Sequence, residues 1–247
     1  PYDVLGCPPA VATEVDRLRV KAKVFIDAGY EGDLLARAGV PYHVARESTQ
    51  EYGEEAAGVR EPVELTPIDP YVKAGDPTSG LLPGITGRFT EAVGTSDAHI
   101  QAYNYRYYVT SDPARRAPLT PPAGYDAKDY ELVGRYVEHL KASITDPKEL
   151  KKRLARIFPG WMNAGEYNYH RNSLITMAPV GISHLYAAGD YAAKAQVWKA
   201  HQDYLRGLHH VMSTDARVPE NFRKETSEIG LDLPRHPDTA GWPGQLY

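Results

Sequence analysis

The 247-residue chain contains a single cysteine, Cys7, and only four phenylalanines. One cysteine excludes an intrachain disulfide and any metal cluster built from several cysteines of this sequence. No stretch approaches the roughly 18 consecutive apolar residues of a membrane-spanning helix, and the N-terminus shows no basic segment followed by an apolar one. We therefore expect a soluble chain with no membrane partner. Because the sequence opens on Pro1 and not on methionine, an upstream region is expected and the missing leader pattern carries little weight.

An excess of positive charge is also missing. The formal net charge is -4, whereas a general nucleic-acid binder normally shows a basic face. The one basic run, Lys148 to Arg156, follows Asp146 and Pro147 and is expected to be the solvated face of a helix. His201, His209 and His210 are spaced poorly for a shared metal ion and no carboxylate completes the set. The sequence predicts neither a nucleic-acid partner nor a metal site.

Tyrosine and proline, by contrast, are abundant, with 18 and 20 residues. Tyrosines on proline-rich loops form surfaces that are apolar but end in a hydrogen-bonding hydroxyl, which suits sugars and other polyhydroxylated ligands. A loop-rich fold whose core is completed with tyrosine would have the same composition. Both interpretations stay open from composition.

The segment from Lys21 to Val40 is the one place where a strand pattern passes through glycines into a helix pattern. Val24 to Ile26 is typical of a strand buried on both faces, and Asp27 to Tyr30 form a turn. Asp33 is placed to cap the following helix, which Gly39 closes. A turn that leads into a helix N-terminus lets backbone N–H groups approach an anionic cofactor, but it is also an ordinary connection in α/β proteins.

An alternating strand is predicted within Ser96 to Asp112. Alternation places Asn104 and Arg106 on one face and Tyr103 and Tyr105 on the other. The amide and guanidinium predict one wall of a substrate pocket, although a half-buried strand with Arg106 in a salt bridge fits equally well.

Helical periodicity and end signals predict four further helices. They span residues 126–140 and 147–157, a long stretch after Gly189, and a short stretch after Pro219.

Several strings resemble, in order, a bacterial family of FAD-dependent oxidoreductases of the two-dinucleotide-binding-domain type. The first is KVFIDAGYEGDLLARAG at residues 23–39, which in the family occupies the place of a turn lying against the FAD. The others are ARESTQEYGEEAAGVR (45–60), GDPTSGLLPGI (75–85), QAYNYRYYVT (101–110), YDAKDYELVGRY (125–136) and GWPGQLY (241–247). The resemblance is weakest before Asp16 and between Trp161 and Gly189.

This resemblance implies FAD as the cofactor. It implies backbone contacts to FAD from Ala28, Gly29 and Tyr30, with Glu31 and Asp33 close to the cofactor or its loop. The family's usual threonine is Gly29 here, so a hydroxyl contact is absent.

The sequence contains no GxGxxG, the turn on which such proteins hold the FAD pyrophosphate. We therefore expect the middle, substrate-side portion of such an enzyme, with a missing segment or a second chain supplying the GxGxxG half and with weak flavin binding by this portion alone. The expected fold class is α/β, seen as α+β in this stretch. Residues 1–45 would form the edge of a Rossmann-like FAD-binding domain, and residues 46–247 a mixed, loop-rich substrate domain.

The function implied is hydride transfer between flavin and a small polar substrate, sugar-like or carboxylated. Arg106 and Asn104 would bind a substrate oxygen, and His170 or a tyrosine would handle the proton, because histidine titrates nearest neutrality. A lone histidine is more commonly structural. The alternative from a different class is a non-catalytic, tyrosine-rich carbohydrate-binding or assembly module that keeps the fold without flavin.

Overall fold

The computed structural model describes residues 21, 23–29, 31–61, 68–85, 87, 90–160, 166–167, 173–179, 181–187 and 189–247. The helices are α1 (Asp33–Arg37), α2 (Glu131–Ser143), α3 (Pro147–Ile157), α4 (Tyr191–Thr214) and α5 (Glu220–Ser227). The strands are β1 (Tyr107–Thr110), β2 (Arg116–Ala117), β3 (Glu166–Tyr167) and β4 (Gly230–Asp232). Short 3₁₀ turns lie at η1 (Pro77–Ser79), η2 (Ala127–Tyr130), η3 (Ile182–Leu185), η4 (Leu233–Arg235) and η5 (Pro237–Thr239).

The four strands form one sheet in the order β2-β4-β1-β3, and every neighbouring pair is antiparallel. Leu231 of β4 is opposite Val109 of β1 on one side and Ala117 of β2 on the other. The described residues thus combine helices with a small sheet, in agreement with the predicted mixed α/β class. They contain no parallel strand pair, so the Rossmann-like part stays a prediction.

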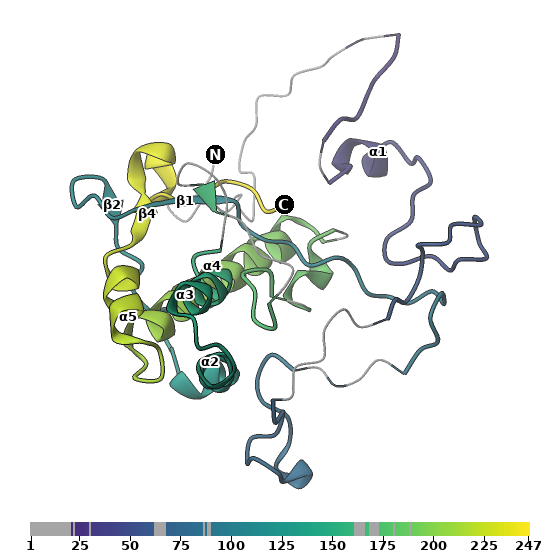
Figure 1. Cartoon of the computed structure of the whole chain (residues 1–247). Helices are drawn as coiled ribbons and strands as arrows, with labels where there is room; N and C mark the ends of the chain where they lie inside the picture. The colour runs from purple at the N-terminus through teal and green to yellow at the C-terminus, as the bar shows by residue number, and fades with distance from the viewer. Residues whose placement is uncertain are drawn as a thin grey trace.

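Helices α2 to α5 gather beside the sheet, while α1 and the long connection after it lie on the other side of the molecule (Figure 1). The helix predicted at residues 126–140 is present as η2 followed by α2, and Val133, Tyr136, Val137 and Leu140 on its inner side are all buried. The buried side of α4 contains Val197 and other apolar residues but also polar ones. No helix in the described ranges is both long and apolar enough to cross a membrane.

Helix α3 has the bounds that its sequence predicts. The Asp146 carboxylate accepts a hydrogen bond from the Lys148 N–H at 2.9 Å, and Pro147 occupies the first turn, where its missing N–H has no consequence. The Lys151 ammonium lies 2.7 Å from the Glu225 carboxylate of α5 on the exposed surface. The basic run is therefore a solvated helix face, as predicted.

The predicted strand at Val24 to Ile26 is wrong for this structure. These residues form no strand, and their exposed fractions are 72%, 61% and 82%. A strand is stable when neighbours satisfy its backbone groups and cover its side chains, and no described strand pairs with this segment. An alternating pattern at Val15, Leu18 and Val20 predicts a strand that could pair with this segment, but it lies outside the described residues.

The predicted strand within residues 96–112 is shorter than expected. Regular pairing begins only at Tyr107, because the neighbouring strands β3 and β4 are themselves two and three residues long. Before it, Asn104 exchanges backbone hydrogen bonds with Tyr247 at 2.8 and 2.9 Å. The C-terminal residue is thereby fixed beside the segment that leads into β1.

Helix α1 is present, but Asp33 does not cap it. The capping position is Gly32, whose φ of 66° is the left-handed conformation that glycine adopts without strain. The Asp27 carboxylate instead accepts hydrogen bonds from the N–H groups of Gly29 (2.8 Å) and Leu35 (2.9 Å). Gly39 ends the helix with a φ of 71°, as predicted.

We predict that Gly230→Ala destabilises the fold by roughly 1–3 kcal/mol, as overpacking does in a close-packed interior. A Cβ at this position of β4 would lie 2.3 Å from the Ala117 carbonyl oxygen of β2, a backbone atom that cannot move aside easily. Chemical denaturation measures the difference. Gly244→Ala is the matched control, since no atom lies within 4 Å of its added Cβ; equal stability of the two variants would contradict the sheet packing described.

Candidate functional site

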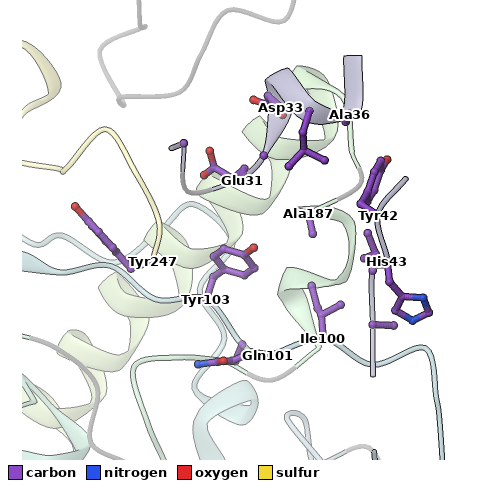
Figure 2. A pocket seen from close by; sticks show the side chains of 16 residues that line it. Glu31, Asp33, Ala36, Tyr42, His43, Ile100, Gln101, Tyr103, Ala187 and Tyr247 are labelled. Atoms are coloured by element: carbon purple, nitrogen blue, oxygen red, sulfur yellow. The ribbon is translucent and has the colours of Figure 1, made fainter. Parts of the chain in front are cut away.

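An open cavity of about 480 Å³ lies between the turn before α1 and the segment before β1. Figure 2 shows Glu31 and Asp33 on one side of it and Gln101 and Tyr103 on the opposite side. The remaining lining residues include Tyr42, His43, Ile100, Ala187 and Tyr247. Two segments that the sequence singled out separately, the glycine turn and the tyrosine-rich segment, thus face the same space.

Gly29 is among the residues that line this cavity, and its contact with FAD stays a prediction. A Cβ on Gly29 would lie 3.0 Å from Oδ1 of Asp27, so a larger residue requires that carboxylate to shift. Hydrogen bonds from the N–H groups of Leu35 and then Gly29 lower the pKa of Asp27. Asp27 is therefore the residue that shapes the turn.

The side chain of Glu31 is held by a hydrogen bond from a buried tyrosine. The Tyr186 hydroxyl donates to Oε1 of Glu31 at 3.0 Å and accepts from the Trp198 indole N–H at 2.9 Å. Burial raises the pKa of the Tyr186 phenol, so the hydroxyl keeps the proton that it donates. This relay connects the turn to α4.

Asp33 is the second attachment of the turn to α4. Its Oδ1 lies 3.0 Å from Nζ of Lys194, whose side chain is 6% exposed. The ammonium also lies over the Tyr186 ring, 5.6 Å from its centroid. A lysine this deeply buried requires a counter-charge, so the contact constrains where Asp33 can lie.

Tyr103, on the opposite wall, is fixed through its backbone. Its N–H donates to the Ser183 hydroxyl at 3.0 Å, and its carbonyl lies 3.0 Å from Nε2 of His201. Nδ1 of His201 lies 2.8 Å from the Val197 carbonyl, and burial lowers the pKa of the imidazole. His201 is thus a buried residue whose two ring nitrogens lie against backbone carbonyls, and it positions the Tyr103 wall. The centroid of the Tyr103 ring lies 4.6 Å from that of Tyr186.

Asn104 and Arg106, the predicted substrate residues, do not line the cavity. Asn104 is 3% exposed, and its amide donates to the Tyr105 carbonyl at 3.0 Å. Arg106 lies nearer, because its guanidinium carbon is 5.3 Å from the centroid of the Tyr247 ring, and Tyr247 lines the cavity. Their role towards a substrate stays a prediction.

The structure gathers only part of the predicted cofactor set. Gly29, Glu31 and Asp33 line the cavity, whereas Ala28 is described but does not. Tyr30 and His170 lie outside the described residues.

Arg46 forms an ion pair with Asp97, 51 residues further along the chain. Nε of Arg46 donates to Oδ1 of Asp97 at 2.9 Å, and a second nitrogen contacts Oδ2. This guanidinium is the main cause of the lowered pKa of Asp97. His209 of α4 also has a structural contact, since its Nε2 lies 3.0 Å from the Thr226 carbonyl oxygen.

Sequence reasoning missed Lys194 and Tyr186. The signal for Lys194 was available, because it falls on the buried stripe of α4 with Val197, Trp198 and His201. A lysine on such a stripe indicates a buried ion pair.

We predict that Tyr186→Phe loosens the turn and lowers stability by about 1–2 kcal/mol, because one hydroxyl both donates to Glu31 and accepts from Trp198. Hydrogen–deuterium exchange of residues 31–37 should accelerate more than exchange in α2. Tyr52→Phe, which removes a hydroxyl from a residue that is 66% exposed, is the control. Identical exchange in the two variants would contradict the relay.

Comparison with known proteins identifies the family. A family model described as FAD dependent oxidoreductase matches residues 10–247. Neither curated proteins nor solved structures give a significant match to the chain. The matched range includes the glycine turn, the Tyr103 wall and α4, and it spans most of the sequence; the chain belongs to the FAD-dependent oxidoreductase family.

Proposed function

We propose that the protein transfers a hydride between a small polar substrate, sugar-like or carboxylated, and FAD bound in part against the turn at residues 27–33. The observation that supports this most is the shared cavity: the turn that resembles the family's FAD-facing segment lies opposite Tyr103 and Gln101. A cofactor on one wall and a substrate on the other would then meet in one space.

The cavity suits only a part of FAD. Its charged lining includes the carboxylates of Glu31 and Asp33, which repel phosphate, and Lys194 is not among the lining residues. Carboxylates, tyrosine hydroxyls and backbone groups are suited to a neutral portion of the cofactor that donates hydrogen bonds. The pyrophosphate would accordingly be held elsewhere, by the GxGxxG half that the family resemblance leads us to expect.

When bound, FAD supplies the two-electron redox centre. The residues of this chain have two tasks: to hold the substrate so that a C–H bond faces that centre, and to move the accompanying proton. In the oxidative direction bound FAD would supply the hydride acceptor, and a base of this chain would take the proton of the substrate O–H. Tyr42 and His43 line the cavity and can take part in that proton transfer, beside the His170 predicted from sequence.

Arg106 is our proposed ligand for a substrate oxygen. Its position over the Tyr247 ring places a fixed positive charge next to the cavity rim. The side-chain amide of Asn104 is already used within the fold, so its proposed contribution is to position Tyr247 through the paired backbone hydrogen bonds.

The first test is the visible absorption spectrum of the purified full-length protein, with the GxGxxG half present. The proposal predicts flavin absorption, with bleaching when a substrate from a panel of aldoses and uronic acids is added anaerobically. A colourless protein that FAD does not reconstitute, alone or with a co-purifying GxGxxG partner, would support the non-catalytic module instead.

For Arg106, we predict that Arg106→Ala slows substrate-dependent flavin reduction roughly ten- to hundredfold, the loss expected for a charge-assisted hydrogen bond. Stopped-flow absorbance measures the rate. Arg235→Ala is the matched control, because Arg235 also lies over a tyrosine ring, that of Tyr108 at 4.6 Å, but does not approach the cavity lining. Equal rates for the two variants would show that the substrate oxygen is bound elsewhere.

A further inference from the structure

A second cavity, of about 780 Å³, lies where the loops at residues 83–84, 122–125 and 174–182 meet η2, the start of α2 and the middle of α4. It shares no lining residue with the cavity at the turn. Its volume is within the range of about 300–1,000 Å³ that is typical of small-molecule sites. Nothing in the proposed flavin chemistry uses it.

Three tyrosines form one wall of this second cavity. The rings of Tyr125 and Tyr130 stack with centroids 5.4 Å apart and planes at 24°, and those of Tyr130 and Tyr204 stack at 6.4 Å and 22°. The Tyr130 hydroxyl donates to the Tyr204 carbonyl, and the Tyr204 hydroxyl donates to the Thr176 carbonyl at 2.6 Å. Both rings are therefore fixed in orientation by the backbone.

Gly207 of α4 makes room for this wall. A Cβ at Gly207 would lie 1.9 Å from the Tyr130 hydroxyl oxygen, so the ring occupies the space that any other residue would fill. The stacked tyrosines thus depend on close approach of a ring to the helix backbone.

The charged lining of the second cavity is acidic. Asp129 and Asp203 both contribute to it. Asp203 is partly neutralised by Lys199 and by Arg206 at 3.8 Å, whereas Asp129 has no ion-pair partner within the described ranges. An anionic ligand is disfavoured, and carboxylate oxygens are available to accept hydrogen bonds from ligand hydroxyls.

Three glycines with backbone N–H donors are also among the lining residues. Gly84, Gly124 and Gly181, one from each loop, all have positive φ and open space where a Cβ would be. Their N–H groups have no hydrogen-bond partner in the part of the chain that the structure describes. Backbone donors therefore stand beside carboxylate acceptors and aromatic rings.

This combination selects the ligand class. A cation would use the carboxylates but would leave the backbone N–H donors without a partner. A neutral polyhydroxylated ring uses all three features: its hydroxyls both donate and accept, and its C–H groups pack on aromatic carbon. We propose that this second cavity binds a neutral saccharide, independently of the flavin.

The test uses methyl α-D-glucopyranoside and methyl β-D-galactopyranoside as probes in saturation-transfer NMR and calorimetry on the purified protein. At least one should bind, and the corresponding methyl glucuronide should bind more weakly because of its charge. Tyr125→Leu and Asp129→Asn should each weaken binding about tenfold. Asp129→Asn changes an exposed side chain, so this variant is expected to fold normally.

Two matched controls accompany these variants. Tyr52→Leu and Asp238→Asn make the same chemical changes at exposed positions that do not line the cavity, and they should leave binding unchanged. Binding of neither glycoside, equal loss in the control variants, or preferential binding of tetramethylammonium would overturn the proposal. The binding measurement does not require flavin reduction. Failure of the saccharide proposal can therefore be distinguished from failure of the proposed oxidoreductase activity.

Discussion

The candidate site depends on one buried charge. Lys194 lies on the inward side of α4, and its ammonium meets the carboxylate of Asp33 at 3.0 Å. A buried ammonium without a counter-ion is strongly unfavourable, so the helix fixes the position of the turn before α1. Tyr186 adds the second contact by donating to Glu31. The turn otherwise has few attachments, since α1 itself is five residues long and contains no buried residue.

The same helix fixes the opposite wall. About two turns beyond Lys194, His201 lies against the Tyr103 carbonyl, and the Ser183 hydroxyl accepts from the Tyr103 N–H. Both walls of the cavity thus contact α4, which is long and largely buried along one side. This arrangement explains how a loop-rich chain holds two irregular segments at a defined separation: a single rigid element contacts both, in keeping with functional residues on loops that are positioned by a stable scaffold.

Local patterns predicted the helices well, and non-local pairing explains the failures. Helix α3 was predictable to its bounds because Asp146 and the following proline act within one turn. The cap of α1 was not, because Asp27 reaches Leu35 from eight residues away. The segment at Val24 to Ile26 has a strand-like sequence, but a strand also needs neighbours, which sequence periodicity does not supply. In the site, the turn residues came from family resemblance, whereas Lys194 required knowing which side of α4 is buried.

The central claim is that FAD contacts the turn at residues 27–33 across the cavity from residues 100–103. Hydrogen–deuterium exchange of the purified protein together with its GxGxxG half, with and without FAD, tests it most directly, because both segments are irregular backbone whose amides are expected to exchange readily when no ligand covers them. The account predicts FAD-dependent protection of both segments, with α2 and α3 unchanged. Protection that omits the turn, or that appears only around the second cavity, would contradict it.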